Sequence, residues 1–204
     1  MKLFVITPPV FLKNESEIIN SLFEIGLENL HFRKPNSSLE ECEQILQEIP
    51  ANFRAKIVIH NHSELVNKLE LKGLHSSSEP RIIGKTLSRS CHSFSELAAN
   101  IKKYDYLFIS SIFDSISKPN LKSSFTINEI ETALVARVLN KQVVALGGIN
   151  LDAIKTLHQL GFKNAAILGY LWEDFLKNYD IVSLKDKFLS IQSECLKYSQ
   201  IIFK

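Results

Sequence analysis

The stretch Val143-Val144-Ala145-Leu146-Gly147-Gly148-Ile149-Asn150 is a short apolar segment that ends at two glycines. One α/β unit later, Ala165-Ala166-Ile167-Leu168-Gly169 repeats the pattern. Each segment predicts a buried strand, and Asn150 can cap a helix that begins directly after the first one. Glycine lets backbone N–H groups approach a ligand closely, and the start of a helix favours negative charge. Because the loops after the last two strands form the phosphate site of many (β/α)8 barrels, the two endings predict this fold and a phosphorylated small-molecule ligand.

The rest of the chain alternates between strand-like and helix-like segments. Strands are expected over residues 2–7, 29–33, 56–60, 72–75, 81–87, 106–110, 142–146 and 164–168. Helix starts are marked by the capping-box pairs Ser38/Glu41, Ser93/Glu96 and Thr126/Glu129. Residues 76–80 are too short for a normal helix, which predicts a reduced fourth crossover, and residues 181–203 predict a C-terminal amphipathic helix. We therefore expect a single-domain α/β fold, a (β/α)8 TIM barrel over residues 1–204, with an open doubly wound sheet as the alternative.

Length and composition limit the class of protein. A chain of 204 residues fits one domain and lies at the short end for a barrel. The net charge of +2 and the lack of a long Lys/Arg run argue against a nucleic-acid partner, and no apolar run reaches transmembrane length. The chain begins with a predicted strand rather than a signal peptide, and its three cysteines form no CxxC pair. These features predict a cytoplasmic protein with no membrane partner.

Polar residues are expected where several of the strands end, which is where the active site of a (β/α)8 barrel lies. They are Arg33 and Lys34, His60-Asn61-His62, His75, Ser90-Cys91-His92-Ser93, and Ser110-Ser111 with Lys118 in the loop beyond. Cations, hydroxyl groups and backbone donors predominate over carboxylates in this set. Such a set suits an anionic, phosphorylated ligand.

Some of these residues allow a second interpretation. His60 and His62 could ligate a metal ion, although capping and hydrogen bonding are commoner roles for such histidines. Cys91 beside His92 could be a nucleophile with its base, although adjacent residues do not normally point at one another. Ser93 has the position of a helix cap.

The ordered set of motifs resembles the thiamine phosphate synthases and their thiazole tautomerase relatives from residue 2 to about residue 172. The motifs are Leu30-His31-Phe32-Arg33-Lys34, Val58-Ile59-His60-Asn61, Gly73-Leu74-His75, Ser90-Cys91-His92-Ser93, Ser111-Ile112-Phe113-Asp114-Ser115 with Lys118-Pro119, and Val144-Ala145-Leu146-Gly147-Gly148-Ile149. The resemblance implies a (β/α)8 barrel and a transferase of thiamine biosynthesis. Such a synthase joins hydroxymethylpyrimidine diphosphate to thiazole phosphate, with Mg²⁺ as cofactor, and releases pyrophosphate.

The resemblance also implies roles for individual residues. Arg33, Ser90 and Lys118 would be catalytic, with Arg33 and Lys118 contacting pyrophosphate and Ser90 binding the leaving group. The further residues expected to bind substrate or phosphate are Lys34, His60, Asn61, His92, Ser111, Gly147, Gly148 and Gly169. Asn61 and Glu79 would be the ligands of Mg²⁺.

The chain departs from the family pattern at several of these positions. The family motif after the second strand resembles Gln-Leu-Arg-Glu-Lys, whereas His31-Phe32-Arg33-Lys34-Pro35 stands here, so the second cation has moved by one position or is lost. His60-Asn61 replaces the family's Asn-Asp, and the second magnesium carboxylate falls near Pro80, where Glu79 could substitute. The tautomerase relatives carry a histidine where Ser111 stands.

Three functions follow as hypotheses. The first is a thiamine phosphate synthase with an altered metal site. The second is an isomerase of the thiazole phosphate that transfers a proton through His92, Cys91 or His75. The third is a non-catalytic barrel that binds thiazole phosphate or thiamine phosphate. A homo-oligomer is possible in each case.

Overall fold

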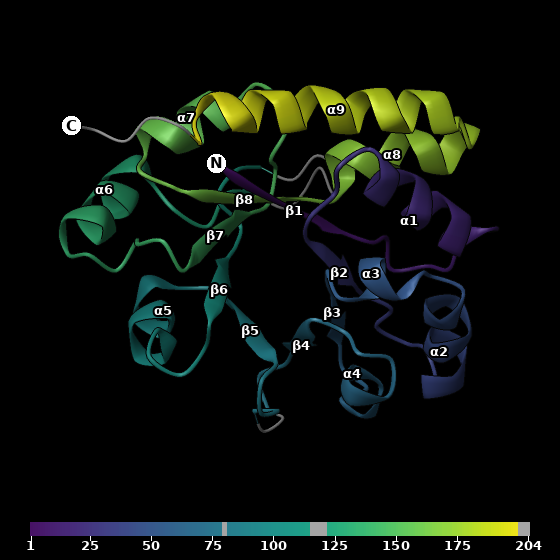
Figure 1. Cartoon of the computed structure of the whole chain (residues 1–204). Helices are drawn as coiled ribbons and strands as arrows, with labels where there is room; N and C mark the ends of the chain where they lie inside the picture. Colours follow the sequence, from purple (N-terminus) through teal and green to yellow (C-terminus); the bar gives the residue numbers. More distant parts are fainter. Residues whose placement is uncertain (79–80, 115–121, 200–204) are drawn as a thin grey trace. The chain divides into compact units, whose positions relative to one another are not determined.

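The computed structural model describes residues 1–78, 81–114 and 122–199, so Glu79 and Lys118 lie outside the described residues. The strands are β1 (Lys2–Ile6), β2 (Leu30–Phe32), β3 (Ile57–His60), β4 (Gly73–His75), β5 (Thr86–Cys91), β6 (Tyr106–Ile109), β7 (Val143–Leu146) and β8 (Asn164–Ile167) (Figure 1). The helices are α1 (Glu15–Glu24), α2 (Leu39–Gln47), α3 (Ala51–Arg54), α4 (Glu64–Lys68), α5 (Phe94–Asn100), α6 (Ile127–Val135), α7 (Ala153–Gln159), α8 (Gly169–Asn178) and α9 (Ile181–Lys197). Strands and helices therefore alternate along the chain, as the sequence predicts.

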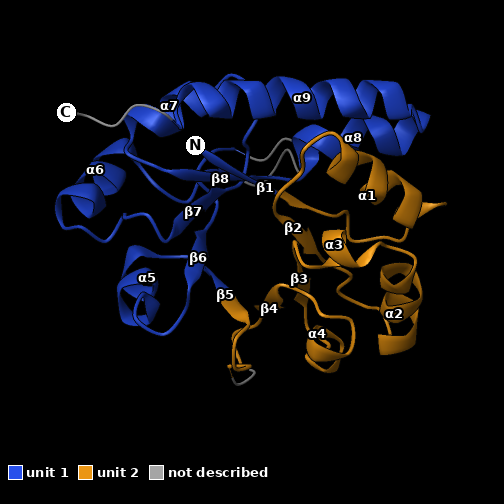
Figure 2. Cartoon of the chain, viewed as in Figure 1, with its two compact units in different colours: residues 1–4, 89–204 blue, residues 5–88 orange. Residues whose placement is uncertain are grey.

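The strands follow one another in the order β1 to β8 as a closed barrel. The pairs from β1–β2 to β4–β5 are parallel, as are β6–β7 and β7–β8. This order confirms the predicted (β/α)8 barrel and rules out the open sheet. Two compact units divide the chain, one of residues 5–88 and the other of residues 1–4 and 89–204 (Figure 2). The division passes through β1 and β5, and each unit is described below by itself.

In residues 5–88, the helices begin and pack as their sequence patterns dictate. Ser38 and Glu41 form the predicted capping box at the start of α2. Helix α1 buries the apolar residues that recur at helical spacing, and the ring of Phe23 stacks on Phe53 with 5.0 Å between centroids. All three residues of β2 are buried, which is typical of a parallel strand covered on both faces.

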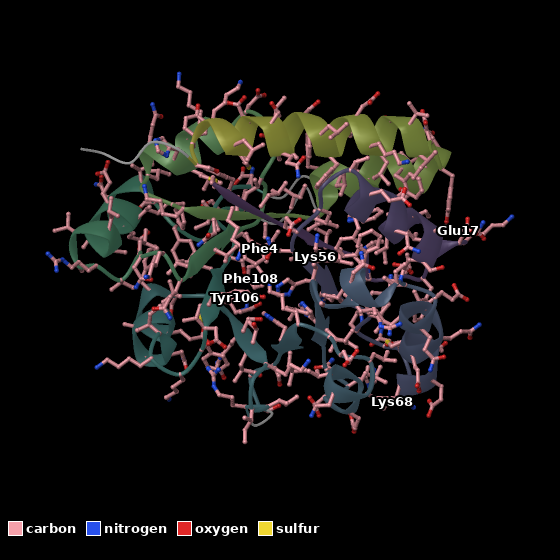
Figure 3. All side chains as sticks on the ribbon, in the orientation of Figure 1. Phe4, Glu17, Lys56, Lys68, Tyr106 and Phe108 are labelled. Atoms are coloured by element: carbon pink, nitrogen blue, oxygen red, sulfur yellow. The ribbon has the colours of Figure 1, made fainter. Side chains whose placement is uncertain are left out.

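In the unit formed by residues 1–4 and 89–204, aromatic rings from β1 and β6 pack together. The ring of Phe4 lies 5.2 Å from that of Tyr106 and 6.0 Å from that of Phe108, measured between centroids (Figure 3). Helix α9 corresponds to the predicted C-terminal amphipathic helix and buries Leu184, Phe188, Ile191 and Cys195. The N-terminal ammonium group of Met1 donates a hydrogen bond of 2.6 Å to the Cys195 carbonyl oxygen. The N-terminal residue is thus hydrogen-bonded to α9.

The predicted position of the fifth strand is wrong. The strand was expected over residues 81–87, but β5 runs from Thr86 to Cys91. Gly84 has a φ of +75°, and the Lys85 N–H donates to the Ile82 carbonyl oxygen at 3.1 Å, so a turn precedes the strand. The apolar residue Ile83, which strengthened the strand pattern, is 97% exposed. As a consequence, Ser90 and Cys91 lie within β5 rather than after it.

The connections between strands agree with expectation at the fourth crossover and differ from it at two helices. Between β4 and β5 the described residues contain no helix, which agrees with the predicted reduced crossover. The sequence did not predict α3 or α8, although α8 buries Leu171, Trp172 and Phe175 at helical spacing. Among the described residues, no helix is both long and apolar enough to cross a membrane.

Candidate active site

Arg33 follows β2 directly, and its backbone is held in place by Thr7 at the end of β1. The Arg33 N–H donates to the Thr7 hydroxyl oxygen at 2.9 Å, and that hydroxyl donates to the Arg33 carbonyl oxygen at 3.3 Å. Thr7 is fully buried, whereas Arg33 is half-buried. This pair of bonds fixes the backbone of Arg33 at a strand end, where the family resemblance implies that its side chain contacts pyrophosphate.

Lys34 is buried, and its ammonium group is surrounded by protein oxygens. The Nζ atom donates to Glu15 Oε1 at 2.6 Å, to the Val10 carbonyl oxygen at 2.7 Å and to the Pro8 carbonyl oxygen at 2.9 Å. Burial lowers the pKa of Lys34 and raises that of Glu15, while each partner's charge opposes the effect on the other. Three acceptors match the three ammonium protons, which indicates that Lys34 holds the loop between β1 and α1. Its predicted contact with phosphate stays a prediction.

Three histidines from neighbouring strands lie together in the same unit. His31 in β2, His60 at the end of β3 and His75 at the end of β4 each offer a ring nitrogen, and these atoms lie within 4.8 Å of one another. His31 Nδ1 is 2.9 Å from His60 Nε2, and the rings of His60 and His75 stack with 4.1 Å between centroids. Below, we call these three residues the histidine cluster.

Strand register explains why the histidine cluster forms. His60 and His75 are opposite one another in the β3–β4 pair, and His31 is opposite Val58, two residues before His60. Side chains alternate between the two faces of a strand with a period of two, so all three imidazoles point to one side. The sequence predicts His60 as a binding residue and His75 as a strand-end residue, but no local pattern joins them with His31.

The histidine cluster is uncharged near neutral pH. Burial is the main cause that lowers the pKa of each ring, and for His75 it does so to about 3 together with the charge of Arg33. The neighbouring histidines lower the pKa of His60 further, followed by Arg33. Neutral imidazole can either donate or accept hydrogen bonds and can bind metal ions.

The residues after β3 turn away from the cluster. Asn61 and His62 both adopt left-handed backbone conformations, with φ of 62° and 53°, and Asn61 is exposed. The His62 ring nitrogen Nε2 lies 3.2 Å from the Ser37 carbonyl oxygen. His62 therefore does not lie with His60 as the second ligand of a metal ion. The histidines that lie with His60 are His31 and His75.

The donor atoms do not fit the Mg²⁺ that the resemblance implies. Mg²⁺ takes oxygen ligands, usually carboxylates, phosphates and water. Within residues 1–78, 81–114 and 122–199, the one group of three or more His, Cys, Asp or Glu side chains placed to hold an ion is the histidine cluster. Asn61 offers a single exposed amide, and Glu79 lies outside the described residues. The described residues thus provide nitrogen ligands rather than a carboxylate site.

In the other unit, the residues near the end of β5 differ in burial and in hydrogen-bond partners. Cys91 is buried, and burial raises the pKa of its thiol to about 11. His92 is exposed, its N–H donates to Glu96 Oε2 at 2.9 Å, and its Nδ1 is 3.3 Å from the Ser110 hydroxyl. Ser90 is half-buried within the strand. Cys91 and His92 therefore lie in different surroundings and do not form a nucleophile with its base.

The chain after β6 packs against the glycine pair that follows β7. Ile112 and Phe113 donate their N–H groups to the carbonyl oxygens of Leu146 and Gly147, at 3.0 and 3.2 Å. Gly147 and Gly148 have φ of 101° and 65°. A Cβ atom on Gly147 would lie 2.8 Å from that of Ser111, and one on Gly148 would lie 2.2 Å from the Asp114 carbonyl oxygen.

These contacts give the glycine pair a packing reason that is independent of any ligand. Only residues without a side chain combine this backbone conformation with so close an approach. Ser111 lies beside Gly147, so the structure brings together these two residues predicted to bind phosphate.

Helix starts follow both β7 and β8. The sequence predicts that the helix after β7 starts directly after Asn150, but α7 begins at Ala153 with Asp152 at its N-cap position. The Asn150 side chain still accepts a hydrogen bond of 2.9 Å from the Ala153 N–H. The ten-residue helix α8 begins at Gly169, directly after Leu168. Leucine has no side-chain acceptor for the first N–H groups of the helix, which makes this helix start suited to an anion.

Comparison with known proteins agrees with this arrangement. Residues 3–171 match the family model described as thiamine monophosphate synthase. The thiamine-phosphate synthase of Haemophilus influenzae is 25% identical over 172 residues, covering 74% of this chain and 75% of the relative. That of Nitrosomonas eutropha is 25% identical over 182 residues, covering 81% and 84%.

Solved structures extend the comparison. The crystal structure of thiamine phosphate pyrophosphorylase from Bacteroides thetaiotaomicron superposes with a TM-score of 0.85 at 34% identity, covering 95% of this chain and 97% of that one. The thiamine phosphate pyrophosphorylase from Pyrococcus furiosus has a TM-score of 0.74 at 18% identity, covers 97% and 96%, and supports the fold alone. The resemblance predicted from the motifs is confirmed. The chain therefore belongs to the thiamine monophosphate synthase family, whose members are transferases of thiamine biosynthesis that act on phosphorylated small molecules.

Proposed function

We propose that this chain joins hydroxymethylpyrimidine diphosphate to thiazole phosphate and that Arg33 stabilises the departing pyrophosphate. The observation that carries the proposal is the position of Arg33, a half-buried cation at the end of β2 whose backbone is fixed by Thr7 at the end of β1. A synthase needs a site for pyrophosphate, whereas an isomerase of the thiazole phosphate does not. A guanidinium is the side chain best suited to the oxygens of such a leaving group.

The proposed reaction is a dissociative substitution. The bond between the pyrimidine methylene carbon and the diphosphate oxygen breaks first, and its electron pair leaves with pyrophosphate. The lone pair of the thiazole nitrogen then forms the new C–N bond. Negative charge develops on the leaving oxygen, so cations and N–H donors aimed at that oxygen lower the barrier. Arg33, Ser90 and Lys118 are the proposed catalytic residues, and Lys118 lies outside the described residues.

The phosphate of the thiazole is proposed to bind in the unit of residues 89–204. The supporting features are the glycine pair after β7, Ser111 beside it, and the start of α8 at Gly169. Backbone N–H groups in left-handed turns and at helix starts bind phosphate oxygens. His60, Asn61 and His92 stay proposed binding residues for the remainder of the substrates.

The proposed reaction is described without a role for Mg²⁺ in any step. The described residues do not form a carboxylate site for it, and no step of the proposed reaction passes through the ion. Asn61 and Glu79 remain its candidate ligands, and a requirement for Mg²⁺ is measured directly by omitting it from the assay below.

The proposed isomerase function is less favoured by the surroundings of Cys91 and His75, two of its three candidate acids and bases, the third being His92. A group that transfers protons near neutral pH works best when its pKa lies near that pH. Burial places the pKa of the Cys91 thiol at about 11, and burial with the Arg33 charge places that of His75 at about 3. Neither value suits proton transfer at pH 7.

The test is the release of pyrophosphate by purified protein given both substrates and Mg²⁺. We expect release by the native chain and a loss of at least about 100-fold in rate for Arg33→Ala, the usual effect of removing one donor to a developing negative charge. Arg81→Ala removes an exposed arginine from the same unit and is the matched control. Native activity no higher than that of Arg33→Ala would refute the proposal.

Two further assignments belong to the proposal. A cytoplasmic location is supported by Cys42, Cys91 and Cys195, which are buried and unpaired as expected in a reducing compartment. A homo-oligomer is proposed without a defined interface, and light scattering of the purified protein at several concentrations tests it.

A further inference from the structure

The histidine cluster is a group of three nitrogen donors that the proposed chemistry of pyrophosphate release does not use. His31 is fully buried, His75 is 9% exposed, and His60 is half-buried. Three imidazoles from three adjacent strands are held by the barrel itself rather than by a loop. A site built on strands places its side chains more precisely than a site built on loops.

The distances within the cluster are close to those that a metal ion imposes. An ion with bonds of about 2.0–2.1 Å to imidazole nitrogens in tetrahedral geometry holds those nitrogens about 3.3–3.4 Å apart. All three donor atoms already lie within 4.8 Å of one another, and His31 Nδ1 and His60 Nε2 are 2.9 Å apart. To receive an ion, the hydrogen-bonded pair has to open by a few tenths of an ångström, and the stacked rings of His60 and His75 have to turn until their nitrogens point at one centre.

Ser88 orients the His75 ring through a hydrogen bond, as is usual for a histidine that binds a metal ion. His75 Nδ1 lies 2.9 Å from the hydroxyl of Ser88, which is fully buried in β5. Metal-binding histidines almost always use their second ring nitrogen in a hydrogen bond that fixes the ring and its tautomer. With Nδ1 on Ser88, Nε2 is the atom that coordinates.

We propose that His31, His60 and His75 bind one divalent transition-metal ion of the zinc class, with an exogenous fourth ligand. Neutral imidazole suits Zn²⁺, Cu²⁺, Fe²⁺ and Ni²⁺ rather than Mg²⁺. Three protein ligands leave one coordination position open, as in catalytic zinc sites. Arg33 and Lys72 act electrostatically on the cluster, and an anionic fourth ligand offsets their charge.

The primary test uses Co²⁺ as a spectroscopic probe, with no substrate present. Protein treated with EDTA and dialysed is titrated with Co²⁺, and visible absorption bands typical of four-coordinate Co²⁺ are expected to saturate at one equivalent. Zn²⁺ added afterwards is expected to displace Co²⁺ and remove the bands. Absence of stoichiometric binding would overturn the proposal.

Variants locate the ion. His60→Gln is expected to weaken Co²⁺ binding at least 100-fold, and Ser88→Ala, which removes the orienting hydroxyl, by about 10- to 100-fold. His62→Gln is the matched control, because His62 is two residues away and its ring contacts the Ser37 carbonyl oxygen instead. It should bind Co²⁺ as the native chain does. Equal weakening by His60→Gln and His62→Gln, or full binding by His60→Gln, would assign the ion to adventitious sites and refute the cluster.

A second measurement uses only the native chain, so a variant that fails to fold cannot affect it. Nitrogen-15 NMR of the native chain with and without one equivalent of Zn²⁺ is expected to shift the ring nitrogens of three histidines and to leave the other three unchanged, since the chain has six in all. A shift confined to exposed histidines would contradict the proposal. The metal titration contains no substrate and the pyrophosphate assay contains Mg²⁺, so either result can fail without the other.

Discussion

In residues 5–88 the ends of β2, β3 and β4 carry large side chains that contact one another, whereas in residues 89–204 glycine follows the ends of β7 and β8. Lys34 and the histidine cluster are examples of the first kind, and the Gly147-Gly148 pair and the start of α8 are examples of the second. The side chains of the first kind form a buried ion pair and a group of nitrogen donors. Backbone at strand ends supplies N–H groups that bind phosphate and are insensitive to pH. One barrel can thus offer two different kinds of recognition.

The largest expected effect concerns the buried ion pair of the first unit. Lys34→Ala leaves the Glu15 carboxylate buried without its cation, which is expected to lower the free energy of unfolding by about 3–5 kcal/mol. Urea denaturation followed by circular dichroism measures the change. Lys56→Ala, at the exposed pair of Lys56 with Glu28, is the matched control and should cost about 0–1 kcal/mol. Similar losses for the two variants would show that Lys34 is not the structural residue inferred here.

The next effect concerns the glycine pair of the second unit. Gly148→Ala adds a Cβ atom where φ is +65° and the Asp114 carbonyl oxygen would be 2.2 Å away. The left-handed conformation alone costs about 1–2 kcal/mol for a residue with a side chain, and the close contact adds to this. Gly84→Ala separates the two contributions, because Gly84 has a φ of +75° but no atom within 4 Å of its added Cβ.

Thermal unfolding of the two glycine variants measures the difference. Gly148→Ala is expected to lose clearly more stability than Gly84→Ala and to bind the thiazole phosphate more weakly. If the two variants unfold alike, the close packing of the chain after β6 against Gly148 does not contribute to stability.

The sequence was sufficient to predict the barrel because strand and helix periodicity is a local property. Capping boxes and strands that stop at glycine are also local. The boxes predicted at α2 and α6 are confirmed, whereas at α5 Ser93 caps the helix but Glu96 accepts the His92 N–H instead of completing the box. The fifth strand was misplaced because the apolar pair Ile82-Ile83 has the same local pattern whether it is buried or, like Ile83, 97% exposed. Local pattern could not distinguish a strand from the turn at Gly84.

The site was less predictable because its contacts depend on register and on distant partners. The stacking of His60 on His75 requires these residues to be opposite one another, and a shift of one residue would turn one ring to the other face of its strand. Lys34 pairs with Glu15, nineteen positions earlier, so no local motif marks it as structural. A useful signal would have been histidine near the end of three successive predicted strands, at His31, His60 and His75.

The smallest expected effect tests whether the two units differ only at their strand ends. Both contain a complete capping box, Ser38 with Glu41 at α2 and Thr126 with Glu129 at α6. Ser38→Ala and Thr126→Ala each remove the side chain that accepts the N–H group of the third helical residue, at a cost of about 1 kcal/mol. Both boxes contain the same pair of backbone hydrogen bonds, and Thr126 adds only an exposed hydroxyl bond to Glu129. The two losses measured by urea denaturation should therefore agree within about 0.5 kcal/mol. A loss confined to one unit would mean that the units differ in local stability as well as in the chemistry of their strand ends, because a cap contributes to global unfolding only where its helix stays folded until the whole chain unfolds.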